Sequence, residues 1–264
     1  MMNLAEYRNR NSRLADFLPW AALVGPGIVL NKDGSFQRTA RFRGPDLDSA
    51  VPAELVAVAG RLNNAFRRLG SGWAIFVEAQ RHPAAIYPVS TFPDAASALV
   101  DAERKADFEE AGAHFESSYF LTFTYLPPAE DAARAETWLY EGREKAGIDP
   151  NELCNAFADR TDRLLRLIEA FMPECRWLDD SEMLTYLHGC VSTHRHRVRV
   201  PETPIYLDAL LADQPLTGGL EPRLGDQHLR VLTITGFPTA TTPGLLDELN
   251  LSLIHISEPT RQEA

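Results

Sequence analysis

Apolar and polar residues first form a regular pattern at positions 28–43, IVLNKDGSFQRTARFR. Two strand-like runs lie on either side of Asp33-Gly34, a dipeptide typical of the tight turn in a β-hairpin. In the second run Phe36 and Phe42 fall on one side and polar residues on the other, because side chains alternate along a strand. The pattern therefore predicts an early β-hairpin with one buried face.

Helical spacing recurs further along the chain. Leu55, Val58, Leu62 and Phe66 lie three or four positions apart, which predicts an amphipathic helix closed by Gly70. Four more helices are expected, at residues 94–112, at 129–146, from Asp149-Pro150 to Pro173, and at roughly 181–190.

Three further runs predict strands. WAIFVE at 73–78 indicates a central strand, because it is apolar and lies between chain breakers. YFLTFTYL at 119–126 alternates aromatic residues with threonine and stops at Pro127-Pro128. HLRVLTIT at 228–235 is expected to be the last strand. Strands and helices that alternate after a hairpin predict an α+β fold, in which amphipathic helices cover a mixed or antiparallel sheet.

Charge and cysteine content limit the class of protein. The 264 residues include 26 Lys and Arg against 37 Asp and Glu, a net charge of -11. Direct nucleic-acid binding is therefore not expected, since a phosphate-binding surface needs clustered basic residues. Cys154, Cys175 and Cys190 are too few and too scattered for a disulfide framework, which favours a reducing cytoplasm.

The longest apolar stretch, residues 17–30, is interrupted by Pro19, Gly25, Pro26 and Gly27. A membrane-spanning helix needs about 20 apolar residues, so this stretch is expected to be buried or interfacial and not to cross a membrane. The first residues, MMNLAEYRNRNSRLADF, carry charges of both signs, unlike a signal peptide.

No phosphate-binding loop is recognisable in the chain. Such a loop requires G-x-x-x-x-G-K-[ST], because backbone amides cradle the phosphate while the lysine supplies charge. No Gly-Lys dipeptide occurs, and the glycine cluster at 216–225 lacks the lysine. The chain is therefore expected not to hydrolyse ATP by itself. A G-x-S-x-G nucleophile elbow is absent as well, so no catalytic or cofactor-binding residue is predicted.

His188, Cys190, His194 and His196 form the strongest metal-ligand constellation. These are zinc-ligand residue types, but their spacing matches no closed zinc site. The surrounding sequence equally suits an exposed strand in which basic and aliphatic residues alternate. No metal site is predicted, and a zinc enzyme remains an alternative. A solvated or partner-facing stripe is expected from Arg195, Arg197 and Arg199.

Residues 1–250 contain the ordered blocks NLAEYRNRNSRLADFLPW, GIVLNKDGSFQRTARFRG, WAIFVEAQRHP, SSYFLTFTYLPP, LHGCVSTHRHRVRVP, YLDALL and HLRVLTITGFPTATTPGLLDELN. These blocks resemble the amino-terminal domain of the conjugal transfer ATPase family of type IV secretion systems (TrbE/CagE type). None of them is a catalytic motif. The resemblance therefore concerns a whole domain, and it is closest to the Trb-type subgroup.

The resemblance implies a protein with two domains. Its amino-terminal α/β domain docks on inner-membrane and channel components of the secretion system, and a carboxy-terminal P-loop domain hydrolyses ATP with Mg. The full-length family is expected to form homo-oligomers in the cytoplasm, peripherally associated with the inner membrane. Residues 1–250 would then be the docking domain, with no cofactor of their own. A stand-alone, non-enzymatic interaction domain of the secretion apparatus is the alternative.

The predicted docking contacts are Trp20, Lys32, Asp33 and Gly34. Trp20 lies in the broken apolar run, and the other three residues form the tip of the hairpin. A contact with a membrane-embedded partner is one hypothesis for these residues. The alternative is that this segment packs on its own domain.

The last residues, 251–264, differ abruptly from the helical pattern TPGLLDELN before them. LSLIHISEPTR, from Leu251 to Arg261, is identical to the translated adapter junction of transposase-made sequencing libraries. The tail is therefore expected to be foreign, and the native chain is expected to continue past Asn250. A native amphipathic strand, LSLIHIS, is the alternative.

Overall fold

The computed structural model describes residues 13–45, 51–83, 87–110, 115–128, 150–231, 233, 236, 239 and 240. Its helices are α1 (Leu14–Phe17), α2 (Pro52–Phe66), α3 (Ala95–Glu110), α5 (Pro150–Glu169), α6 (Asp180–Val191) and α7 (Leu207–Leu211). Its strands are β1 (Trp20–Gly25), β2 (Ile28–Asn31), β3 (Phe36–Arg43), β4 (Trp73–Pro83), β5 (Phe115–Tyr125), β6 (Glu174–Trp177), β7 (Leu216–Thr217), β8 (Arg223–Leu224) and β9 (Gln227–His228).

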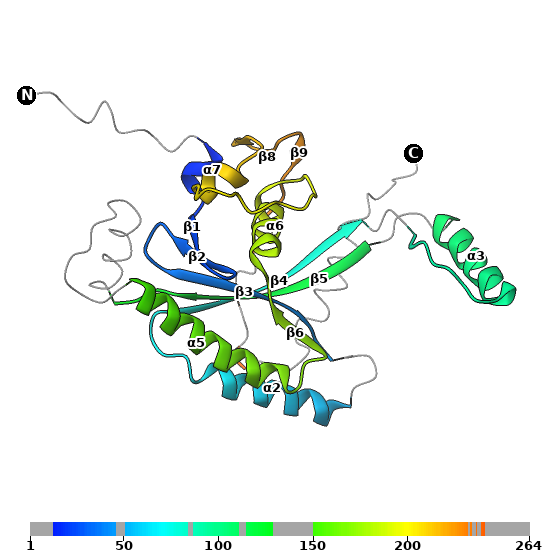
Figure 1. The fold of residues 1–264 in the computed structure, drawn as a ribbon, viewed down its shortest axis with the longest axis horizontal. Coiled ribbons are helices and arrows are strands. Elements are labelled where there is room, and N and C mark those ends of the chain that lie inside the picture. The colour runs from blue at the N-terminus through cyan, green and yellow to red at the C-terminus, as the bar shows by residue number, and fades with distance from the viewer. Residues whose placement is uncertain are drawn as a thin grey trace, which may run out of the picture.

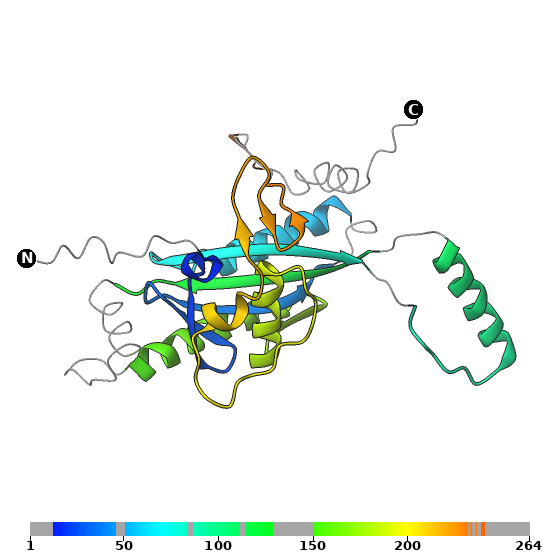
Figure 2. The same ribbon diagram turned by 90° about the horizontal axis from the view of Figure 1, so that it is seen from above.

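The main sheet is antiparallel, and helices lie on both of its faces (Figures 1 and 2). Its strands follow the order β1-β2-β3-β5-β4, and β6 also pairs with β3. β3 is central because one of its edges pairs with β5 along most of its length. Its other edge is shared, first by β2 and then by β6. The predicted α+β fold with an antiparallel sheet is confirmed.

The predicted hairpin at 28–43 is also confirmed, and hydrogen bonds within its turn fix the register between β2 and β3. The Asn31 amide donates to the Ser35 carbonyl at 2.8 Å, which closes the turn. Asp33 Oδ1 accepts hydrogen bonds from Ser35 N at 3.0 Å and Ser35 Oγ at 2.7 Å. Gly34 has a φ of 80°, a conformation that residues other than glycine rarely adopt.

Helices α2 and α5 cover one face of the sheet (Figure 1). α5 buries Phe157, Leu164 and Ile168, which recur at helical spacing and form one apolar stripe. Phe157 stacks on Phe36 of β3, with ring centroids 5.7 Å apart. Burial of this stripe fixes the helix on the sheet, since apolar area removed from water is the main stabilising contribution.

One charged side chain lies inside this layer. Arg38 of β3 is 9% exposed, and its Nη1 lies 2.7 Å from Asp162 Oδ1 on α5. The guanidinium also lies over the Trp177 ring, 4.2 Å from its centroid. Trp177 Nε1 donates to the same Asp162 oxygen at 2.7 Å. The carboxylate therefore joins β3, β6 and α5.

Helices α6 and α7 cover the opposite face of the sheet (Figure 1). Asp179 caps α6, because its Oδ1 accepts from the Glu182 amide at 2.8 Å. The core on this side contains Trp20, Leu184 and Leu187. Trp20 is 8% exposed and packs among these residues.

The helices predicted at 94–112 and 181–190 and the helix predicted after Asp149-Pro150 are confirmed as α3, α6 and α5. The first predicted helix is confirmed as α2, although it ends at Phe66 and not beside Gly70. The helix predicted at 129–146 lies outside the described residues. No helix in the described part of the chain is both long and apolar enough to span a membrane.

Two strand predictions need correction. The run at 73–78 belongs to β4, which extends to Pro83 and lies at the end of the strand order. Its Phe76 and Val77 stay exposed, at 57% and 68%, so an apolar run does not by itself distinguish an edge strand from a central one. The strand predicted at 228–235 is wrong where the chain is described. β9 ends at His228, and residues 229–231 belong to no strand.

Candidate functional site

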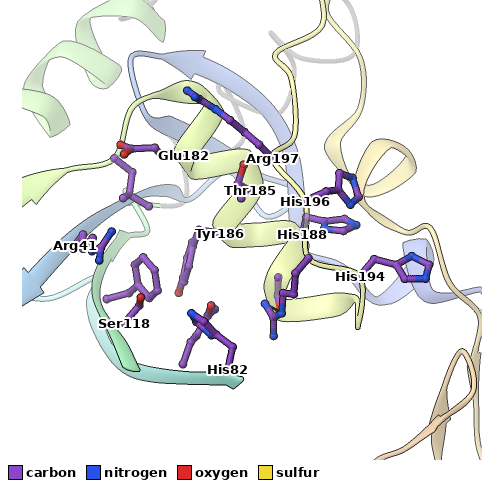
Figure 3. Close-up of a pocket in the computed structure, with 15 residues that line it drawn as sticks. Arg41, His82, Ser118, Glu182, Thr185, Tyr186, His188, His194, His196 and Arg197 are labelled. Carbon is purple, nitrogen blue, oxygen red and sulfur yellow. Dashed lines mark hydrogen bonds between the residues drawn. The ribbon is translucent and has the colours of Figure 1, made fainter. Parts of the chain in front are cut away.

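A cavity of about 680 Å³ opens on the α6 side of the sheet (Figure 3). We call it the α6 groove. Three strands, α6 and the segments just before and after α6 contribute its walls. The lining residues are Arg41, Gln80, His82, Ser118, Phe120, Leu178, Glu182, Thr185, Tyr186, His188, Gly189, His194, Arg195, His196 and Arg197.

Two aromatic rings and Leu178 form the apolar portion of the α6 groove. The Phe120 and Tyr186 centroids lie 4.5 Å apart, with a tilt of 38°. Tyr186 Oη donates to Glu78 Oε2 on β4 at 2.7 Å and lies 3.4 Å from Thr122 Oγ1. Burial raises the pKa of Tyr186, and Cys190 and Glu78 add to the shift. The hydroxyl therefore stays protonated and holds α6 on the sheet.

Arginines approach the α6 groove from different elements. Arg41 comes from β3 and forms no ion pair with any residue that the structure describes. Arg195 Nη1 donates to the Gly189 carbonyl at 3.0 Å, and Arg197 Nε donates to Ser181 Oγ at 3.0 Å. Neither acceptor carries a charge, although the Arg197 guanidinium also lies close enough to Glu182 to help lower the pKa of that carboxyl.

Glu182 is the single carboxylate among the described lining residues. Both of its oxygens bind Arg176, at 2.7 Å each. The hydrogen bonds from Arg176 lower the pKa of Glu182 to about 2. Glu182 is thus ionised and paired with Arg176, and the described lining residues hold three arginines against this one carboxylate.

Two histidines that line the α6 groove share one carboxylate oxygen. His188 Nε2 lies 3.1 Å and His194 Nδ1 lies 3.0 Å from Asp213 Oδ2. Burial alone would raise the pKa of Asp213, but hydrogen bonds from His194, His188 and Ser192 lower it to about 2. This carboxylate fixes the end of α6 to the segment after α7.

The four residues of the zinc alternative do not all converge, although the His188 and His196 ring centroids lie 4.5 Å apart. His188 and His194 bind Asp213, whereas Cys190 Sγ lies beside Glu78, 3.7 Å from its Oε2. Enclosure of the sulfur raises the pKa of Cys190 to about 12, so the thiol is not poised to bind a cation. Within the described ranges, no group of three or more His, Cys, Asp or Glu could hold a metal ion.

The predicted docking residues lie apart from the α6 groove. Trp20 belongs to the buried core, and Lys32 Nζ pairs with Asp208 Oδ2 on α7 at 2.7 Å. Asp33 and Gly34 form the hairpin turn. Their docking role stays a prediction, and the burial of Trp20 leaves little of that side chain for a partner.

Sequence reasoning finds only one wall of the α6 groove. Arg195 and Arg197 belong to the predicted partner-facing stripe, and both line the groove. Arg41, His82 and Phe120 carry no local signal, because only the sheet register brings their strands together.

Comparison with known proteins identifies relatives for this chain. Residues 27–133 match the family model described as type IV secretion system ATPase VirB4/TrbE, N-terminal domain. Conjugal transfer protein TrbE of Rhizobium radiobacter is 35% identical over 268 residues, which are 95% of this chain and 33% of that protein. A probable conjugal transfer protein TrbE of Sinorhizobium fredii, the first of two chains that carry this name, is 42% identical over 130 residues. The match covers 48% of this chain and 87% of that protein.

A more distant relative is type IV secretion system protein virB4 of Brucella suis. It is 36% identical over 67 residues, 25% of this chain and 8% of that protein. This chain thus spans about a third of the Rhizobium radiobacter relative, 33% of its length.

Proposed function

Because the chain belongs to the VirB4/TrbE family of type IV secretion system ATPases, we propose that it supplies the docking domain of a conjugal transfer motor. In this proposal the domain binds inner-membrane and channel components of the transfer apparatus. It does so from the cytoplasm, as a peripheral protein. Homo-oligomers form when the motor is full length.

ATP hydrolysis, with Mg, belongs in this proposal to a carboxy-terminal domain that lies outside these residues. The support is twofold. No Gly-Lys dipeptide occurs in the 264 residues, although a phosphate-binding loop requires one. The match to the Rhizobium radiobacter protein extends along nearly the whole chain but covers only a third of that relative. The partial coverage of this relative is the observation on which the proposal chiefly rests.

A competition experiment tests it. The chain is expressed in a donor bacterium whose conjugative plasmid encodes its own TrbE-type ATPase. If the domain occupies the motor's docking sites without supplying hydrolysis, plasmid transfer to recipient cells falls. Unchanged transfer, with the chain present and folded at a level above that of the resident ATPase, would contradict the docking function.

The alternative is a stand-alone interaction domain, and a complementation experiment tests it. A donor that lacks its own TrbE-type gene is supplied with this chain alone. A domain that acts without a motor restores some of the transfer, whereas the proposed docking fragment restores none.

A further inference from the structure

We propose that the α6 groove binds an extended acidic segment of a partner protein, an inference that rests on the docking function proposed above. The groove combines an excess of arginines over carboxylates, an apolar floor and a strand edge. Each of these three features selects a different property of the occupant.

The charge of the α6 groove selects an acidic occupant. Arg41, Arg195 and Arg197 line it, and its single lining carboxylate, Glu182, already binds Arg176 outside the lining. The whole chain carries a net charge of -11, so this positive groove is a local exception. Such a patch steers acidic partners towards itself and repels basic ones.

The size and floor of the α6 groove favour a peptide over a small inorganic anion. Its volume is about 680 Å³, and Phe120, Tyr186 and Leu178 supply apolar surface that a phosphate ion would leave unused. In Figure 3, Arg41 and His194 lie on opposite sides of Tyr186, so the basic groups do not converge on one point. Apolar side chains set between carboxylates would match this arrangement.

The edge of the sheet favours an extended conformation. Gln80 and His82 of β4 line the α6 groove, and β4 pairs only with β5 among the described residues. Within the described ranges the other edge of β4 is unpaired, and an unpaired edge can accept main-chain hydrogen bonds from an added strand. His82 Nδ1 is buried and has no hydrogen-bond partner in the described portion of the chain.

A short synthetic peptide that alternates Glu with Leu and Phe is the probe. Its carboxyl-terminal fluorescein reports binding to the full chain by anisotropy. We expect saturable binding that weakens with added salt, and about tenfold weaker binding of a peptide with Gln at every Glu position. Equal binding of the Glu and Gln peptides would overturn the inference. Full displacement of the Glu peptide by inorganic phosphate would overturn it too, because the site would then be one for a small anion.

Matched charge reversals locate the site. Arg41→Glu changes the α6 groove, whereas Arg163→Glu makes the same charge change on the exposed surface of α5, across the sheet. Arg41→Glu is expected to weaken binding of the Glu peptide about tenfold and Arg163→Glu less than about twofold. Equal losses of peptide binding in the two variants would show a general effect of charge and would overturn the assignment of the site to the α6 groove. Arg41→Gln is the second variant if Arg41→Glu does not fold, and it should show a smaller loss in the same direction.

The donor competition experiment separates this inference from the proposed function. If both the wild-type chain and Arg41→Glu lower plasmid transfer, the docking function stands and the α6 groove is not its contact. If the peptide binds through Arg41 but the wild-type chain leaves transfer unchanged, the groove stands and the docking function falls. If the Arg41→Glu chain no longer lowers plasmid transfer while the Arg163→Glu chain still does, the result supports both the docking function and the α6 groove as its contact.

Discussion

Tyr186 on α6 donates a hydrogen bond to Glu78 on β4, with 2.7 Å between Oη and Oε2. This bond lies under the α6 groove and joins the helix to the edge strand. The Tyr186 ring contacts Phe120 on the neighbouring strand β5, so the same side chain contributes both apolar and polar contacts.

Tyr186→Phe keeps the ring and removes the hydroxyl. Because Glu78 Oε2 then loses the hydrogen bond from Tyr186, the free energy of unfolding should fall by about 1–2 kcal/mol. Urea unfolding followed by circular dichroism measures the change. Tyr119→Phe is the control, since Tyr119 lies on β5 but is 40% exposed. A loss of equal size in the control would mean that the buried hydrogen bond has no special role.

Asp162→Asn should destabilise the fold through Arg38. Arg38 is 9% exposed and would lose its only countercharge among the described residues, while the amide side chain keeps the shape. Asp162 is partly exposed, so we expect a cost of about 2 kcal/mol, below that of a fully buried pair. The comparison is with Asp159→Asn, an exposed position on the same helix, in parallel urea titrations. Indistinguishable midpoints would refute the structural role of the Arg38–Asp162 pair.

Acid should weaken the protein partly through Asp213. Burial alone would raise the pKa of this carboxyl, but hydrogen bonds from His194 and His188 lower it from 3.8 to about 2 in the folded state. A lowered pKa adds stability that is present above pH 3.8 and is lost as the pH falls through about 2. Asp213→Asn should therefore show a smaller loss of unfolding free energy over this window than the wild-type chain. Parallel pH profiles for the two proteins would disprove the linkage.

Trp20→Ala tests whether this residue belongs to the core or to a docking surface. The side chain is 8% exposed and packs with Leu184 and Leu187, so truncation should cost about 3–5 kcal/mol of unfolding free energy. Thermal unfolding measures the loss. Phe17→Ala is the control, because Phe17 is 61% exposed on the adjoining helix α1. A stable Trp20→Ala protein that no longer competes in donor cells would favour the docking hypothesis instead.

Local chemistry explains which elements could be predicted from sequence. The Asp33–Gly34 turn and the apolar stripe of α5 are specified within a few residues, and both predictions are confirmed. β1 has no such signal, because Pro26 and Gly27 interrupt the apolar run. Gly27 in fact forms the turn between β1 and β2, with a φ of 62°.

The features that could not be predicted from the sequence depend on pairing between distant strands. The apolar run at the start of β4 does not tell how many strands will flank it, so its edge position could not be derived. The α6 groove depends on the same information. His82 lines it only because β4 pairs with β5, and Arg41 only because β3 does.

The shared edge of β3 also sets an order of assembly during synthesis. Ala40 pairs with Leu121 on one side and with Trp177 on the other. While the ribosome is still translating β5, the second half of β3 therefore has no neighbour on the side where β6 will lie. This half of β3 keeps an unpaired edge until residue 177 has left the ribosome. A pause in translation before that point would prolong the time in which other nascent chains can pair with that edge.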